Sequence, residues 1–221
     1  CAEVCRFDAI HEQDGRYLVD PIACDGCAAC VYQCPTEAIS MQPQIAGLFF
    51  ISDSRYGPLF HAALKPAQEN SGKLVTLVKQ RARLLALDEG RDLVLVDGPP
   101  GIGCPVISAV SGADLVLIVA EPTVSGTHDM ERVLETAAHF NIPAVVCVNK
   151  ADLYPEGTTK IEQYCQEHDL ELVGQVPFDA SVTAAMVQGE AVTAYQPDSP
   201  ASQSLAQIWE TLVARLGVIP A

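Results

Sequence analysis

Hydrophobic residues form short uninterrupted runs in the second half of the chain, and this pattern predicts a parallel sheet. The runs are Leu93–Val96, Leu115–Ala120 and Ala144–Val148. Runs of this length that are rich in valine and isoleucine are typical of strands with both faces covered by helices. A further strand is expected at Leu172–Val176.

Between these runs the apolar positions recur at helical spacing, which predicts a helix after most strands. We expect helices at Ser71–Leu87 with Ser71 as the N-cap, at Thr127–Phe140, at 158–167 and at Gln203–Leu216. Strands that alternate with helices indicate an α/β fold with a doubly wound, mostly parallel sheet.

The first 64 residues follow a different pattern of short strands and turns. Asp14-Gly15 separates Ile10 from the run Tyr17–Val19, which is typical of a β-hairpin. Residues 46–64 contain two extended segments around Arg55–Pro58. We therefore expect three parts, at 1–41, 42–70 and 71–221.

Composition narrows the class of function. The chain has 28 Asp and Glu against 13 Lys and Arg, a net charge of −15, which argues against a nucleic-acid surface or an anionic membrane as partner. No apolar run approaches the roughly 20 residues of a membrane-spanning helix, and no signal peptide is recognisable. Nine cysteines, an odd number, cannot all pair in disulfides, so we expect a cytoplasmic protein whose clustered thiols hold metal or do redox chemistry.

Four cysteines near the start have the spacing of a bacterial iron–sulfur motif. They are Cys24, Cys27, Cys30 and Cys34, followed by Pro35, in the pattern C-x2-C-x2-C-x3-C-P. Small residues in the run let the backbone wrap closely around a cluster, so that its amides can bond to sulfur. Zinc at the cysteine pairs and free thiols are the alternatives, but a third cysteine at the same spacing is harder to explain with zinc.

An upstream repeat supplies two further cysteines. Cys1–Ile10 echoes Cys30–Ile39, with Cys5 matching Cys34. In two-cluster ferredoxins the fourth cysteine of each run binds the other cluster. On this rule one complete [4Fe-4S] site has four ligands, Cys24, Cys27, Cys30 and Cys5. A second, incomplete site has Cys1 and Cys34.

Two motifs in the α/β part have the chemistry of nucleotide binding. Asp97 follows the run Leu93–Val96 and opens Asp-Gly-Pro-Pro-Gly, where an acid can hold Mg²⁺ and Gly101 lets a backbone N–H approach a terminal phosphate. The alternative is a turn that leads into a helix. Asn149-Lys150-Ala151-Asp152 follows the third run and is a base-reading pattern, for which a polar loop with an Asx cap is the alternative.

One further segment and three further cysteines carry weaker signals. Pro177-Phe178-Asp179 lies where a second base-contacting loop is expected, with Pro177 as the contact. Cys104 is best explained as a structural or free thiol, and Cys147 and Cys165 as ordinary core or surface thiols.

These motifs together resemble a known family. Residues 1–41 resemble a two-cluster bacterial ferredoxin, and residues 71–216 resemble the C-terminal two thirds of the MinD/Mrp/nitrogenase iron protein group of P-loop ATPases. The segments 54–59, 70–75 and 97–105 are similar to MinD-superfamily ATPases with an inserted ferredoxin domain. The resemblance implies a P-loop NTPase-type sheet beside a small α+β iron–sulfur domain, with ATP and Mg²⁺ as ligands of the full-length parent.

In that family a phosphate loop and its strand precede the ferredoxin insertion, and neither is recognisable here. Asn70–Lys73 is similar to one, but Ala67 replaces its first glycine. We therefore expect that the chain is N-terminally truncated. Because the phosphate loop is missing, we also expect that this chain alone does not hydrolyse ATP. The resemblance implies ATP-gated electron transfer to a redox partner protein by a homodimer or a pair with a paralogous ATPase. An iron–sulfur assembly or carrier ATPase and a non-enzymatic ferredoxin module are the alternatives.

Overall fold

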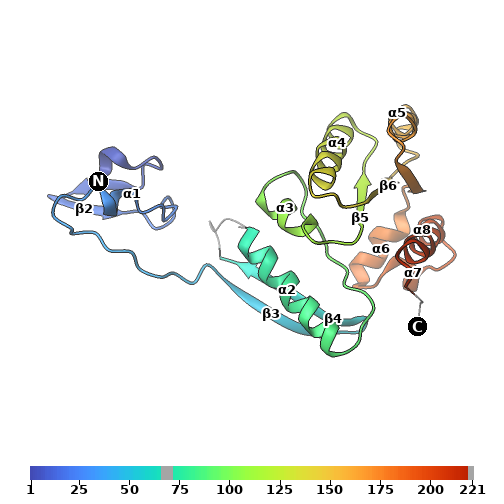
Figure 1. Ribbon diagram of the computed structural model, residues 1–221, viewed down its shortest axis with the longest axis horizontal. Helices are drawn as coiled ribbons and strands as arrows, with labels where there is room; N and C mark the ends of the chain where they lie inside the picture. Colours follow the sequence, from blue (N-terminus) through green and yellow to red (C-terminus); the bar gives the residue numbers. More distant parts are fainter. Residues whose placement is uncertain (66–71, 219–221) are drawn as a thin grey trace. The chain divides into compact units, whose positions relative to one another are not determined.

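The computed structural model describes residues 1–65 and 72–218 (Figure 1). Two compact units divide them: one holds residues 1–50 and 61–65, the other residues 51–60 and 72–218.

The first unit is built on a small hairpin. β1 (Ile10–Gln13) and β2 (Arg16–Val19) pair antiparallel, with Ile10 opposite Val19. Asp14 and Gly15 between them have φ values of 52° and 72°, the left-handed conformations of a tight hairpin turn. The structure thus confirms the predicted hairpin. A single 3₁₀ turn, η1 (Ala2–Val4), precedes it, and the short helix α1 (Ala29–Tyr32) follows it.

A longer hairpin links the two units along the chain. β3 (Gly47–Ser54) and β4 (Gly57–Leu64) form a two-stranded sheet, as the two extended segments predicted. The Ser54 hydroxyl organises its turn, since it accepts the Tyr56 N–H at 3.2 Å and donates to the Gly57 carbonyl at 2.7 Å. The turn belongs to the second unit, whereas the distant ends of both strands belong to the first.

The second unit contains a parallel sheet of three strands in the order β5-β6-β7. The strands are β5 (Val116–Ala120), β6 (Ala144–Asn149) and β7 (Glu171–Val176). They confirm three of the four predicted strands and the parallel sheet.

The strand expected at Leu93–Val96 is absent from the described part of the chain, so this prediction was wrong. A strand exists where a neighbour takes its hydrogen bonds. The sheet among the described residues has the order β5-β6-β7, and no strand of it pairs with residues 93–96. Leu95 is accordingly 84% exposed.

Helices pack against both faces of the sheet at β6, and successive side chains of this strand point to opposite faces. Val146 and Val148 pack with Met130 of α4 (Val124–His139) and Ile161 of α5 (Pro155–Glu167). Cys147 points the opposite way and packs with α8 (Pro200–Leu216). The result is a three-layered α/β unit, and Figure 1 shows α4, α8 and the strands between them.

Four further helices complete the second unit. α2 (Gly72–Asp88) confirms the predicted helix after the hairpin, although the predicted N-cap Ser71 lies outside the described residues. The sequence did not predict α3 (Cys104–Val110), α6 (Ala180–Gln188) or α7 (Val192–Tyr195). Among the described residues, no helix is long and apolar enough to cross a membrane.

Candidate functional site

The predicted base-reading residues lie at the carboxyl edge of the parallel sheet. Asn149 is the last residue of β6, and Lys150 and Asp152 follow it. Because parallel strands end at the same edge, the residues after β5 and after β7 are their neighbours. This edge is where ligands bind in open α/β sheets.

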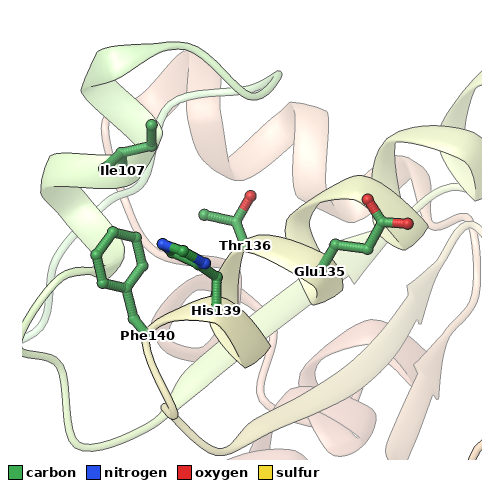
Figure 2. Close-up of a pocket in the computed structure, with 5 residues that line it drawn as sticks. All are labelled: Ile107, Glu135, Thr136, His139 and Phe140. Carbon is green, nitrogen blue, oxygen red and sulfur yellow. The ribbon is translucent and has the colours of Figure 1, made fainter.

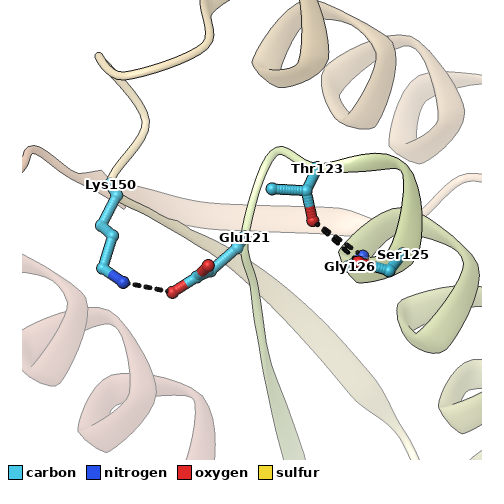
Figure 3. A network of polar contacts seen from close by, with 5 residues as sticks. All are labelled: Glu121, Thr123, Ser125, Gly126 and Lys150. Carbon is cyan, nitrogen blue, oxygen red and sulfur yellow. Dashed lines mark hydrogen bonds and ion pairs between the residues drawn. The ribbon is translucent and has the colours of Figure 1, made fainter.

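Lys150 ties the end of β6 to the end of β5. Its ammonium lies 2.6 Å from Oε1 of Glu121, the residue directly after β5 (Figure 3). The backbone of Lys150 has φ 55°, a left-handed conformation that is uncommon for a residue with a side chain. The turn after β5, which holds Glu121, leads into α4, and the Thr123 hydroxyl caps this helix by accepting the Gly126 N–H at 3.0 Å.

Asp152 ties the same loop to β7. Its Oδ1 accepts the backbone N–H of Phe178 at 2.6 Å, and the Ala151 N–H donates to the Val176 carbonyl at 3.1 Å. The Thr158 hydroxyl of α5 donates to the Ala151 carbonyl at 2.7 Å. One carboxylate oxygen of the predicted base reader is therefore already bonded within the chain.

Two glycines let helix backbones approach this edge. A Cβ on Gly126 would collide with the Glu121 carbonyl, and a Cβ on Gly157 would collide with the Pro122 carbonyl. The first turns of α4 and α5 therefore pack directly against the turn after β5. Only glycine fits at these two positions unless the backbone moves.

The segment after β7 has a capping role. Oδ1 of Asp179 accepts the Ser181 N–H at 2.9 Å at the start of α6, and its Oδ2 accepts the Ala201 N–H at 3.2 Å in the first turn of α8. The neighbouring Ser181 side chain, and then the bonded N–H groups of Ser181 and Ala201, hold the pKa of Asp179 below its usual value. Pro177, two residues earlier, is half-buried at the carboxyl edge.

The acidic loop that carries Asp97 is exposed and lies just before α3. Gly101 has φ 84°, which a residue with a side chain rarely adopts, and α3 begins at Cys104. The structure thus places Asp97 in a loop rather than at a strand end, and its predicted role with Mg²⁺ stays a prediction.

Lys79 of α2 fixes the far end of α3. Its ammonium donates to the carbonyls of Ala109 at 2.6 Å, Ser111 at 2.7 Å and Ser108 at 3.2 Å. Burial, and then the charge of Arg83, lower the pKa of Lys79. The cation lies at a helix C-terminus, where exposed carbonyls and the helix dipole both favour it. Nothing in the sequence indicated this contact, because Lys79 lies on an otherwise ordinary amphipathic helix.

The repeated cysteine segments have the same local geometry. Cys5 Sγ accepts the Ala9 N–H at 3.3 Å, and Cys34 Sγ accepts the Ala38 N–H at 3.3 Å. In each loop the residue before that donor is left-handed, with φ 49° at Asp8 and 52° at Glu37. The structure therefore bears out the repeat that the sequence indicated.

Hydrogen bonds make Cys34 a better thiolate. The Thr36 hydroxyl contributes most to lowering the pKa of this thiol, followed by the Ala38 N–H. Donors to sulfur stabilise the anion that binds metal.

All nine cysteines are free thiols. Cys1, Cys5, Cys30 and Cys34 are half-buried, whereas Cys24 and Cys27 are exposed. Within residues 1–65 and 72–218, no three His, Cys, Asp or Glu side chains converge as one metal site requires. The thiol chemistry and the N–H···S bonds fit an iron–sulfur cluster, and the ligand assignment stays a prediction.

The remaining thiols are separate from this segment. Cys147 and Cys165 are buried in the sheet core, and burial raises the pKa of Cys147 to about 11. Cys104 is exposed at the start of α3.

A hollow of about 290 Å³ lies between α3 and α4 (Figure 2). Ile107 of α3 lies on one side, and the His139 ring stands edge-on to Phe140, with 5.1 Å between ring centroids. Glu135 and Thr136 of α4 complete the lining. None of the residues predicted to bind the nucleotide or the cluster lines this hollow, so the hollow does not support either hypothesis.

Comparison with known families agrees with the division of motifs. Residues 88–213 match the family profile described as "ParA: NUBPL iron-transfer P-loop NTPase", and residues 17–40 match the "4Fe-4S binding domain". The first match covers more than half of the chain.

Related proteins cover different shares of the chain. An uncharacterized protein of Methanocaldococcus jannaschii is 32% identical over 213 residues, which is 96% of this chain and 69% of the relative. The cytosolic Fe-S cluster assembly factor NUBP1 homolog of Caenorhabditis elegans is 29% identical over 143 residues, 57% of this chain and 46% of the relative. The structure of the MinD cell division protein of Aquifex aeolicus has a TM-score of 0.58 at 24% identity, covering 77% of this chain and 70% of that one. This likeness shows the fold.

Proposed function

We propose an iron–sulfur cluster carrier, because this chain belongs to the ParA/NUBPL family of P-loop NTPases and also contains a ferredoxin-like cysteine segment. In this proposal residues 1–41 hold a [4Fe-4S] cluster as cargo, and ATP with Mg²⁺, bound by the second unit within the full-length parent, controls its delivery to an acceptor protein. The observation that carries the proposal is that an iron-transfer NTPase profile and a 4Fe-4S profile match successive stretches of one chain. A nucleotide-binding unit and a cluster-binding unit are then covalently joined.

The thiol contacts support the cluster half of the proposal. Cys24, Cys27, Cys30 and Cys5 supply the complete ligand set, while Cys34 and Cys1 supply the partial one. Donors to sulfur adjust how firmly a cluster is held, and Cys5 and Cys34 each accept one. Four of the six thiols are half-buried, which limits exchange with solvent ligands.

The loops of the second unit support the nucleotide half. Asp97 would hold Mg²⁺ and the left-handed Gly101 would let its N–H approach a terminal phosphate. Asn149, Asp152 and Pro177 would surround the base at the carboxyl edge of the sheet. Because the Phe178 N–H already occupies one acceptor site on Oδ1 of Asp152, its Oδ2 is the freer oxygen to accept from a base.

Cluster transfer tests the first half. The chain is reconstituted anaerobically with Fe²⁺ and sulfide, mixed with an apo-ferredoxin acceptor, and followed by visible circular dichroism. We expect transfer within minutes. Cys30→Ala should abolish loading, whereas the matched variant Cys165→Ala, a buried thiol outside the cysteine segment, should load normally. Zinc at stoichiometry without visible absorbance would contradict the cluster assignment.

Nucleotide dependence tests the second half. Mg²⁺-ATP should change the transfer rate of the full-length parent, and Asp97→Asn should remove the effect. Asp114→Asn changes the same charge outside the candidate loops, so it should behave like the unmodified parent. A transfer rate that ignores Mg²⁺-ATP would contradict this half alone.

An ATP-gated electron carrier is the second candidate. The repeated cysteine segments favour it, because both loops reproduce the same N–H···S contact, as expected of two resident clusters. Such a protein should retain its clusters through repeated reduction and oxidation and pass electrons to a redox partner protein. Retention with no transfer to the acceptor would select this candidate over the carrier.

A further inference from the structure

The hollow between α3 and α4 lies away from the candidate nucleotide residues. Glu135, Thr136, His139 and Phe140 come from the C-terminal end of α4, and Ile107 comes from α3. Because α4 begins after β5 and ends before the parallel strand β6, its C-terminal end lies at the amino edge of the sheet. The predicted base-reading residues lie at the opposite, carboxyl edge. The hollow is therefore a separate feature of the second unit.

The polar groups of the hollow mostly accept hydrogen bonds. The Glu135 carboxylate can only accept, and a neutral His139 ring has one acceptor nitrogen. The Thr136 hydroxyl donates its proton to the Arg132 carbonyl at 2.9 Å, so toward the hollow it can only accept. Among the described residues, no lysine or arginine lines the hollow. A ligand that fits must therefore bring several donors.

The charge at the hollow is negative. Within the part of the chain that the structure describes, Glu135 forms no ion pair, and Arg132 of α4 does not line the hollow. Partial burial, and then the charges of Glu131 and Glu135, raise the pKa of the Tyr164 side chain, so the field of these carboxylates reaches their surroundings. The C-terminus of a helix adds partial negative charge at the same place. A positively charged ligand is favoured.

The shape of the hollow suits one long side chain. Ile107 and Phe140 lie on one side of the His139 ring and Glu135 lies on the other (Figure 2). The volume of about 290 Å³ is below the roughly 300–1,000 Å³ of sites that hold drug-sized ligands. A guanidinium is flat, has five donors and stacks on aromatic rings, whereas an ammonium is a compact point charge. An arginine can therefore lay its methylene stem on the apolar side and direct its donors to the acidic side.

We propose that this hollow binds an arginine side chain of a partner protein. The guanidinium donates to the Glu135 carboxylate and the Thr136 hydroxyl, and the stem contacts Ile107 and Phe140. Free arginine fits less well, because its own carboxylate would lie near Glu135, and the described lining offers no lysine or arginine to pair with it. The inference goes beyond the proposed cluster transfer and does not depend on it, since the hollow contains neither the cysteine segment nor the candidate nucleotide loops.

Two-dimensional ¹H–¹⁵N NMR of the full chain, titrated with acetyl-Ala-Arg-Ala-amide, tests the proposal. The blocked ends of this peptide carry no charge. We expect the amide signals of residues 107 and 135–140 to shift and saturate. The same peptide with citrulline in place of arginine keeps the shape but loses the charge, so it should bind at least about tenfold more weakly. A peptide with lysine in place of arginine should also bind more weakly, because it lacks the flat, five-donor head.

A pair of matched variants assigns the charge to the hollow. Glu135→Gln keeps the size of the side chain and should weaken binding of the arginine peptide at least about tenfold. Glu210→Gln removes one exposed carboxylate from α8, on the other face of the sheet, and should leave the dissociation constant unchanged. An equal loss in both variants would show a general charge effect and overturn the proposal.

The remaining outcomes decide the nature of the ligand. Signals of residues 107 and 135–140 that do not shift, or a citrulline or lysine peptide that binds as tightly as the arginine peptide, would overturn the assignment to arginine. Free arginine should bind more weakly than the blocked peptide. Equal affinity of the two would instead indicate a site for a small molecule and would overturn the assignment to a partner protein.

Discussion

Lys79→Met should loosen α3 while leaving the parallel sheet intact. The ammonium of Lys79 donates to three carbonyls at the end of α3, at 2.6, 2.7 and 3.2 Å. Methionine keeps the length and helix propensity of the side chain but removes all three donors. At the start of α2, a Cβ on Gly72 would lie 2.5 Å from Ser108 Oγ and 3.0 Å from the Cys104 carbonyl oxygen, so α2 and α3 are also closely packed there. The variant therefore removes the polar half of this contact and keeps the packed half.

The magnitude follows from the kind of bond. A hydrogen bond from a charged donor contributes about 1.5–3 kcal/mol, and a cation at a helix C-terminus contributes about 0.3–1 kcal/mol. Lys79 is half-exposed, so water replaces part of what is lost, and the three bonds are not additive. We expect a loss of about 1.5–3 kcal/mol in the local stability of α3. The amides of α3 should then exchange with solvent about tenfold to hundredfold faster.

Hydrogen exchange followed by mass spectrometry measures this at residues 104–110. Lys160→Met is the matched control, because Lys160 is an exposed helical lysine of α5. Exchange in α3 that is as slow in Lys79→Met as in the control would refute the reasoning. Lys79 also sets a pH dependence: its pKa is lowered on folding, so the unfolded chain binds more protons between the folded pKa and 10.5. Stability should therefore rise with pH in that window, and this rise should be absent in Lys79→Met.

Three further predictions concern the sheet and the helix α5 that packs against it. Gly157→Ala should destabilise the second unit by about 1–3 kcal/mol, because the new methyl group collides with the Pro122 carbonyl. Gly98→Ala is the control, because a methyl group at Gly98 meets no neighbouring atom. Urea unfolding of both variants measures the difference in stability. Cys147 should resist iodoacetamide in the folded chain while Cys104 reacts, as peptide mass spectrometry can show. Folding raises the pKa of the Cys147 thiol to about 11, so as pH rises the unfolded chain loses the thiol proton before the folded chain does. Stability should fall by up to about 2 kcal/mol between about pH 9 and pH 11, and Cys147→Ala should lack this fall.

The sequence predicted elements well where burial alone determines them. The run that became β6 is apolar on both faces, and the structure buries it between helices on either side. The flanking strands are less covered, since β5 exposes Leu117 and Val119 and β7 exposes Gln175. The run at 93–96 has the same composition and is not a strand, because a strand also needs a hydrogen-bonded neighbour. Composition reports whether a segment prefers burial, and it does not report whether a partner is present.

The candidate site was predictable in type but not in detail. The repeat of Cys5 and Cys34 was visible as spacing, and the structure adds the N–H donors and left-handed residues that orient both sulfurs. Asp179 is different: its segment was expected near a base, but the carboxylate caps α6 and α8. An aspartate after a strand can serve a ligand or the next helix equally well, and only tertiary structure decides between them.

The loop after β6 connects these observations. Lys150 pairs with Glu121 after β5, and Asp152 pairs with Phe178 after β7, so one four-residue motif joins all three strand ends. A ligand that draws the Asp152 carboxylate away from Phe178 must break a 2.6 Å hydrogen bond inside the protein. Since Phe178 directly precedes Asp179, breaking that bond would shift the carboxylate that caps α6 and α8. A base that moved Asp152 in this way would thereby alter the position of α6 and α8, and this coupling would not require Asp97.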